Sequence, residues 1–189
     1  MRSTTAPALL LAGAGLVAAL SGCTSTTPGS APTATVTTTA TPPPPTEGTA
    51  TSTCGPSDAR DAAAAPIAAL PVPEGLSGET WDASGADYSG YDACAALSWS
   101  VATFARATSS SPYAILLFHD GSYLGTATST SYAFSPNVAR EADDRLSVTY
   151  RYAKGSDSNA DPTGRTTATL TWNASTQKVD FSGTTPPTP

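Results

Sequence analysis

Apolar and polar residues alternate along several stretches in the second half of the chain, and this period of two is typical of β-strands with one buried face. The stretches cover residues 95–104, 146–152 and 166–172, and residues 178–181 add a short last one. The apolar members of the three longer stretches are Leu97, Trp99 and Val101; Leu146, Val148, Tyr150 and Tyr152; and Ala168, Leu170 and Trp172. We therefore expect these side chains to face a common core.

Residues 113–118 differ because they are apolar without interruption. A strand of this kind is buried on both faces, so we expect it at the centre of a sheet. Asp120-Gly121 follows and separates it from residues 122–128. Asp-Gly between two such runs predicts a β-hairpin with a type I′ turn.

One helix is predicted before the strands. Ser57 is a suitable N-cap, acidic residues at Asp58 and Asp61 favour the first turn, and residues 62–65 are all Ala. Pro66 is expected to end or kink the helix. Residues 71–92 are rich in Gly, Pro, Ser and Asp, which indicates a long irregular connection.

These elements together predict an α+β fold, with a mostly antiparallel sheet of five or six strands and one N-terminal helix. An all-β sandwich is the alternative. All 14 aromatic residues lie between Trp81 and Phe181, so we expect one globular domain at residues 54–183. A domain of about 130 residues is large enough to fold alone.

The N-terminus has the pattern of an export signal. Arg2 precedes 13 uncharged residues at positions 8–20, which suits a secretory signal, whereas a membrane span needs about 20 apolar residues. The stretch ends in Leu20-Ser21-Gly22-Cys23, which resembles the lipobox of bacterial lipoproteins. The resemblance implies that residues 1–22 are a signal peptide and that Cys23 carries a lipid anchor with acyl chains such as palmitate. An ordinary secretory cleavage site is the alternative.

Residues 24–53 have the composition of a tether. They contain 13 Thr, six Pro and three Ser, with Glu47 as their only charge and no aromatic residue. Such a segment cannot bury a core, so residues 23–53 are expected to form an acylated, disordered tether, open to O-glycosylation. Residues 182–189 have a similar composition, and we expect a disordered tail at residues 184–189.

Three cysteines are present, and with Cys23 assigned to the lipid, Cys54 and Cys94 remain as a pair. Thiols of exported proteins are usually oxidised, so we expect a disulfide between them. Two buried thiols are the alternative. We expect no metal site, because the pair lacks C-x-x-C spacing and His119 is the only histidine.

Charge and motifs limit the possible functions. The net charge is -6, which disfavours binding to nucleic acid or anionic lipid. His119 and Asp120 could act in acid–base catalysis, but they lie at the predicted turn, and no G-x-S-x-G motif is present. Residues 157–161 resemble half of a Ca²⁺ loop, but the required Gly is replaced by Pro162. We therefore expect no catalytic residues and no cofactor.

Tyrosine and tryptophan side chains are the remaining candidates for a binding site. Aromatic rings with polar tips suit sugars and amphipathic lipids, although packing in the core is the more ordinary role. The residues that could line a ligand groove are Trp81, Tyr88, Tyr91, Tyr113 and Tyr123, with Tyr132 beside them.

Several ordered motifs resemble the actinobacterial LppP/LprE lipoprotein family. The central one is Leu116-Leu117-Phe118-His119-Asp120-Gly121. The others lie at residues 91–99, 111–113, 123–128, 148–152 and 157–160. The resemblance implies a lipid-anchored protein of the cell envelope, and it carries no catalytic or binding residue to this chain.

The sequence as a whole predicts an extracytoplasmic lipoprotein on the outer face of the cytoplasmic membrane. We expect a non-enzymatic module that binds an envelope protein or glycan. A carrier or sensor that holds a lipid or glycan in a hydrophobic cavity is the alternative.

Overall fold

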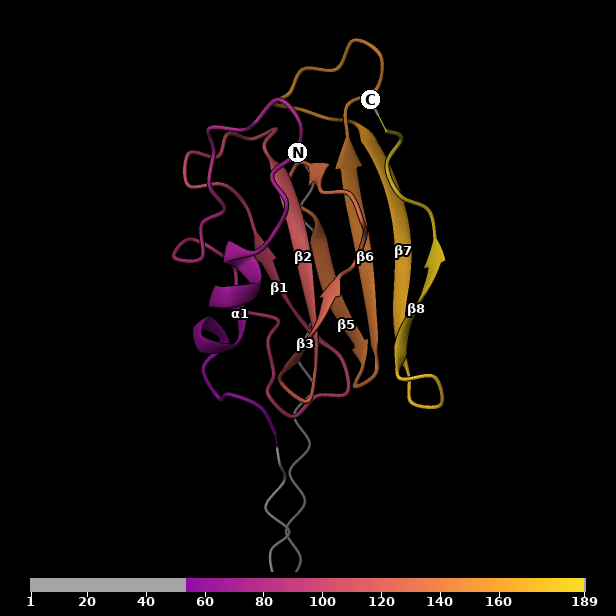
Figure 1. Cartoon of the computed structure of the whole chain (residues 1–189). Helices are drawn as coiled ribbons and strands as arrows, with labels where there is room; N and C mark the ends of the chain where they lie inside the picture. Colours follow the sequence, from indigo (N-terminus) through magenta and orange to yellow (C-terminus); the bar gives the residue numbers. More distant parts are fainter. Residues whose placement is uncertain (1–53, 189) are drawn as a thin grey trace, which may run out of the picture. The chain divides into compact units, whose positions relative to one another are not determined.

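The computed structural model describes residues 54–188, so the predicted signal peptide, Cys23 and the tether lie outside the described residues. One helix precedes eight strands, and Figure 1 shows how these elements are arranged. Their bounds are α1 (Ala59–Ala68), β1 (Ser98–Ala102), β2 (Pro112–His119), β3 (Ser122–Thr126), β4 (Tyr132–Ala133), β5 (Asn137–Ala142), β6 (Arg145–Tyr152), β7 (Gly164–Asn173) and β8 (Lys178–Gly183).

The strands form two four-stranded sheets. The first has the order β1-β2-β3, with β4 also paired to β2, and the second has the order β5-β6-β7-β8. All pairs are antiparallel. The predicted α+β class is confirmed, whereas the predicted number of five or six strands is too low. The alternative, an all-β sandwich, describes the two sheets alone. The helix α1 adds a third layer to them.

Strand β2 is central and buried on both faces, as the apolar run predicts. Its residues Ala114 to Phe118 are all buried. Ile115 and Leu117 point to the second sheet, while Leu116 and Phe118 point to the helix. Successive side chains of a strand alternate between its faces, so β2 contributes to two separate cores.

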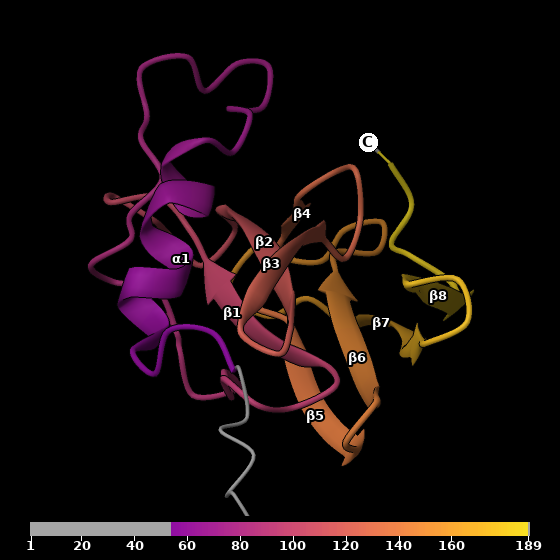
Figure 2. The same cartoon turned by 60° about the horizontal axis from the view of Figure 1, so that its bottom comes forward.

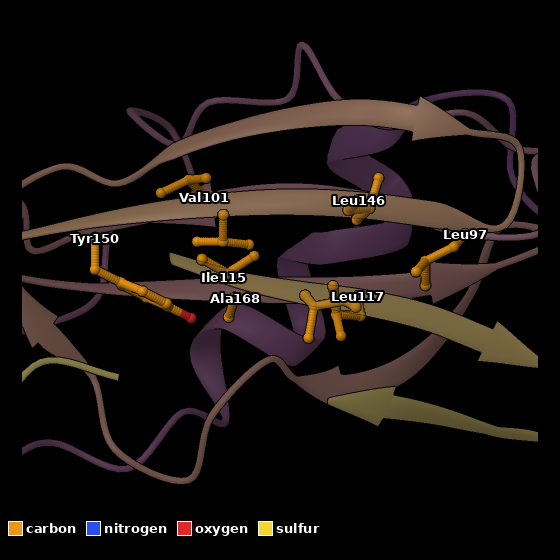
Figure 3. Close-up of a cluster of buried hydrophobic side chains, with 9 residues drawn as sticks. Leu97, Val101, Ile115, Leu117, Leu146, Tyr150 and Ala168 are labelled. Atoms are coloured by element: carbon orange, nitrogen blue, oxygen red, sulfur yellow. The ribbon is translucent and has the colours of Figure 1, made fainter. Parts of the chain in front are cut away.

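The first core, here called the inter-sheet core, lies between the two sheets (Figure 3). Its strands β1 and β2 face β6 and β7 across a closely packed interior. Its buried members are Leu97, Val101, Ile115, Leu117, Leu146, Val148, Tyr150, Ala168 and Leu170. Trp99 and Trp172 are partly buried against it, so the predicted inward faces are confirmed except at Tyr152, whose ring lies beside the Lys154 ammonium instead.

The second core, here called the helix-side core, lies between α1 and the opposite face of the first sheet. Figure 2 shows α1 on one side of β1, β2 and β3, with β6 and β7 on the other. Its buried members are Ala63, Ile67, Leu70, Ala102, Ala114, Leu116 and Phe118. The domain is thus built as helix, sheet and sheet.

The β2–β3 hairpin has the predicted turn. Asp120 and Gly121 both have positive φ angles, 46° and 72°, as a type I′ turn requires. The start of the domain packs on this turn, because the Gly55 amide donates to the Asp120 carbonyl at 2.8 Å. A Cβ atom on Gly55 would lie 2.8 Å from the backbone of Gly121, so this contact needs glycine.

A disulfide joins Cys54 to Cys94, as the sequence predicts, with their Cα atoms 5.0 Å apart. It links the segment before α1 to the segment before β1. Closing a loop of this length stabilises a fold by roughly 4 kcal/mol in the chain-entropy model. The disulfide therefore fixes the helix layer to the first sheet at its N-terminal end.

The ends of the helix differ from the prediction by a few residues. The N-cap is Asp58, not Ser57, because the Asp58 carboxylate accepts from the Arg60 amide at 2.8 Å. Pro66 lies inside the helix, which ends two residues later at Ala68. A proline is tolerated there because only the last turn loses a hydrogen bond.

Two strands were not predicted from the sequence. Strand β4 has only two residues, and β5 contains the charged pair Arg140 and Glu141, so neither shows an apolar alternation. The segment after β8 begins with a contact to β7. The Thr184 amide donates to the Thr167 carbonyl at 3.0 Å, and Pro186 is buried.

We predict that Leu116→Ala lowers the free energy of unfolding by about 2–5 kcal/mol, the usual cost of a cavity in a closed core. Leu116 is fully buried in the helix-side core. Urea unfolding measures the change. Leu124→Ala is the matched control, since Leu124 is 39% exposed, and a loss as large as that of Leu116→Ala would contradict the assignment of the core.

We predict that ionisation of Tyr150 destabilises the fold at high pH. Burial in the inter-sheet core raises the pKa of Tyr150 from 10.0 to about 12. The stability that depends on the neutral phenol is therefore complete below pH 10 and is lost as the pH rises toward 12. The variant Tyr150→Phe should lose less stability between pH 9 and pH 11 than the wild type, measured by urea unfolding. Equal losses in the two proteins would contradict the prediction.

Candidate functional site

A surface groove lies at the end of the helix layer and is called the Trp81 groove. It has a volume of about 320 Å³. One wall is the chain that leaves α1, at residues 70–74, and the other is the connection from β3 to β4, at residues 126–131. Trp81 and Ala114 of β2 complete the lining. The groove is open to solvent and therefore accessible without a change of fold.

Trp81 is held in place by three contacts. Its ring stacks on Phe104 with the centroids 4.2 Å apart, and the backbones of these two residues form an isolated β-bridge. The indole N–H donates to the Pro71 carbonyl at 3.2 Å. The ring is thus fixed both to the sheet and to the wall of the groove, which is the preorganisation that a binding residue needs.

The opposite wall consists of hydroxyl side chains. The hydroxyl of Thr126 donates to the Thr128 carbonyl at 2.8 Å, and the hydroxyl of Thr128 donates to the Thr130 carbonyl at 2.7 Å. These bonds fix the path of the loop. Within residues 54–188, the hydroxyls of Ser129, Thr130 and Ser131 make no comparable bond, so they are available to a ligand. Glu74 is the one charged residue among the described residues of the lining.

The five aromatic residues proposed from the sequence do not line one groove. Trp81 lies in the groove, and Tyr88 and Tyr91 pack on the helix-side core. Tyr113 lies on the opposite face of β2, against the inter-sheet core. Tyr123 is 40% exposed on β3. The structure therefore does not bring these five residues together, and Trp81 is the member that lines the Trp81 groove.

Tyr88 and Tyr91 have structural contacts that explain their positions. The Tyr88 hydroxyl donates to the Ala83 carbonyl, and the Arg60 guanidinium lies 5.1 Å from the centre of its ring. The Tyr91 hydroxyl donates to the Pro56 carbonyl at 2.6 Å. Burial raises the pKa of both hydroxyls. Both residues thus tie the irregular segment to the helix layer.

His119 lies between the two sheets rather than at a free turn. Its ring stacks on Trp172 of β7 with the centroids 4.0 Å apart, and its Nδ1 lies 2.7 Å from the Ala96 carbonyl. Its Nε2 is 3.4 Å from the Asp120 carboxylate, so these neighbours approach each other although adjacent strand residues usually point apart. The left-handed backbone of Asp120, at the start of the turn, permits this approach.

In the loop at residues 157–161, the Asp157 carboxylate is used by hydrogen bonds to its own loop. The Asp157 carboxylate accepts from the Lys154 amide at 2.8 Å and from the Thr163 amide and hydroxyl at 2.8 and 2.9 Å. These hydrogen bonds, with that of Lys154 first, lower the pKa of Asp157. The carboxylate acts as the centre of a turn, which is the usual role of Asp in a loop.

The two open sides of the sandwich differ. On the side of β1 and β5, Arg140 donates to the Leu97 carbonyl at 2.7 Å and to the Gly90 carbonyl at 3.3 Å, and its guanidinium lies over Trp99. On the side of β3 and β8, a second hollow of about 240 Å³ lies between the sheets. Its apolar lining includes Leu117, Leu124, Trp172 and Val179.

Sequence reasoning missed most of the Trp81 groove. Its hydroxyl wall is a Ser/Thr-rich loop, which has the same composition as a linker. Its other wall contains Pro71 and Pro73, which belong to the segment predicted as a long irregular connection. No local pattern shows that these two segments meet, because pairing of β3 with the central β2 brings them together.

Residues 54–188 contain no helix that is long and apolar enough to cross a membrane.

Comparison with protein families shows that residues 89–175 match the LppP/LprE lipoprotein family. The match begins just before β1 and ends just after β7, so it includes the hydroxyl wall of the Trp81 groove and leaves out α1 and Trp81. No curated protein and no solved structure was found to match the chain. Residues 89–175, which contain strands β1 to β7, are an LppP/LprE lipoprotein family domain.

Proposed function

We propose that this protein is a lipid-anchored lipoprotein of the cell envelope, held by Cys23 on the outer face of the cytoplasmic membrane, and that its domain binds another envelope component without catalysis. The family supports the lipid anchor. The Cys54–Cys94 disulfide supports an extracytoplasmic position, since disulfides persist in oxidising compartments. The tether of residues 23–53 separates the domain from the anchor in this proposal.

The observation that carries the binding function is a preformed surface groove beside two closely packed cores; the second hollow, on the side of β3 and β8, is smaller and is also open to solvent. Side chains fill both faces of β2, and the Trp81 groove is formed from fixed residues on the surface. A carrier would instead hold its ligand in a dry internal cavity. The filled inter-sheet core therefore favours a surface-binding module over the carrier.

The contacts of His119 favour a structural role over a catalytic one. One ring nitrogen is within hydrogen-bond distance of the Ala96 carbonyl, and the ring face is covered by Trp172. A general base must reach the proton that it removes, but the described ring lies against the second sheet and away from the Trp81 groove. The only histidine of the chain thus serves to join the two sheets.

We predict that His119→Ala lowers the free energy of unfolding by about 1–2 kcal/mol, because it removes a stacked ring and a hydrogen bond. His119→Phe keeps the stack on Trp172 and should lose less. Urea unfolding at neutral pH compares the two variants. Equal stability of wild type, His119→Ala and His119→Phe would argue against this structural role.

We predict that Cys23→Ala releases the protein from the membrane. The full chain, expressed in an actinobacterial host, should fractionate with membranes and show the mass of two or more acyl groups on Cys23, because one chain binds only marginally. The variant should lose both properties. Ser25→Ala is the matched control and should behave as the wild type. Wild-type protein that is free of lipid and recovered in the medium would contradict the proposal.

Binding and carriage can be separated with the same preparation. Native mass spectrometry of the full wild-type chain in detergent should give the mass of the acylated polypeptide alone. A second lipid or glycan that remains bound in stoichiometric amount would favour the carrier.

A further inference from the structure

We propose that the Trp81 groove binds a short segment of a neutral glycan. The inference rests on the non-catalytic binding function proposed above and gives that function a site and a ligand class. The groove, of about 320 Å³, lies at the lower end of the range of about 300–1,000 Å³ that is usual for small-ligand sites. A few sugar units of a longer chain are therefore a better match than a large folded partner.

Trp81 provides the apolar surface that a sugar ring requires. A pyranose or furanose ring has one face of C–H groups, which packs on an aromatic ring, and an edge of hydroxyls. Trp81 is half-buried, with its indole N–H bonded to Pro71 and one face stacked on Phe104. A ring fixed in this way loses little conformational entropy when a ligand binds. Val72, which is 41% exposed on the adjacent wall, enlarges the apolar surface.

The opposite wall provides hydrogen bonds for the hydroxyl edge of a sugar. Ser129, Thr130 and Ser131 can each donate and accept one, as sugar hydroxyls also can. Thr126 and Thr128 use their donors on the loop itself, so the free hydroxyls of this wall are those of Ser129, Thr130 and Ser131 among the described residues. Glu74 adds a carboxylate, which can only accept hydrogen bonds and so can bind sugar hydroxyls as donors.

The charge of the groove selects a neutral ligand. Glu74 is its one charged side chain among the described residues, so nothing in the described lining balances a phosphate, sulfate or carboxylate. The chain as a whole carries a net charge of -6, which adds repulsion at long range. Anionic polymers and anionic lipid headgroups are thus disfavoured by both local and overall charge.

Two other ligand classes match the groove less well. An acyl chain needs an enclosed apolar cavity, whereas one wall here consists of hydroxyls and the groove is open. A proline-rich peptide binds in a groove lined by several aromatic rings, whereas Trp81 is the only aromatic residue among the described lining residues. A glycan uses one aromatic ring together with hydroxyls, which is the combination present.

The test uses the full chain, purified in detergent micelles from an actinobacterial host and titrated by isothermal calorimetry. The neutral probes are maltotetraose, cellotetraose, chitotetraose and mannotetraose. The anionic probe is tetragalacturonic acid, and the peptide probe is a synthetic copy of residues 37–50. We expect at least one neutral oligosaccharide to bind, and neither the anionic probe nor the peptide to bind.

Variants locate the site. Trp81→Ala should weaken binding about tenfold or more. Because this change can also disturb the contact with Phe104, the double variant Ser129→Ala/Thr130→Ala removes two hydroxyls from exposed side chains and should weaken binding about threefold to tenfold with unchanged unfolding. Tyr123→Ala is the matched control, since it removes an exposed aromatic residue outside the groove, and should bind as the wild type.

Three results would overturn the inference. They are no binding of any neutral probe, binding that survives in both groove variants, and binding of the peptide or of tetragalacturonic acid in preference to the neutral sugars. The lipid anchor and its fractionation are measured separately. Loss of membrane attachment would therefore reject the proposed location, and absence of sugar binding would reject only the ligand class.

Discussion

Burial of both faces of β2 is the constraint on which the rest of the domain depends. An uninterrupted apolar strand cannot leave either face in water, so the chain must supply a layer on each side. The second sheet covers Ile115 and Leu117, and the helix with its following loop covers Leu116 and Phe118. The three-layer order therefore follows from six consecutive residues. Strands β1 and β3 form the edges of the first sheet.

The irregular segment at residues 71–92 covers the edge formed by β1. It follows the outer side of β1, where the amide and carbonyl of Asp87 and Val101 exchange hydrogen bonds of 2.8 Å. This contact covers a sheet edge that would otherwise invite pairing with other chains. The same segment presents Trp81 at the end of the helix layer. Protection of the edge and construction of the groove are thus achieved by one stretch without regular secondary structure.

Sequence patterns predicted the elements whose burial is one-sided or complete, and missed those at the periphery. The alternation of residues 146–152 and the apolar run of residues 113–118 each have one physical explanation, and the Asp120-Gly121 turn has a specific backbone requirement. Strand β5 was not predicted because its Arg140 looks like an ordinary surface charge in the sequence. In the structure, the Arg140 guanidinium donates to the carbonyls of Leu97 and Gly90. The Trp81 groove was not predicted because its two walls lie far apart in the sequence and each resembles a linker. Their nearest residues, Glu74 and Thr126, are 52 positions apart.

The position of the disulfide determines how the domain responds to a pull on the chain before Cys54. The covalent bond carries tension from Cys54 directly to Cys94, four residues before β1, and bypasses α1 and the segment that follows it. Oxidised protein therefore receives the force at the sandwich, where paired strands resist together. After reduction the same force would break the Gly55–Asp120 and Tyr91–Pro56 hydrogen bonds and then pull on α1, and the wall at residues 70–74 would move with the helix. The oxidation state of one pair of cysteines thus decides whether the groove keeps its shape under mechanical stress.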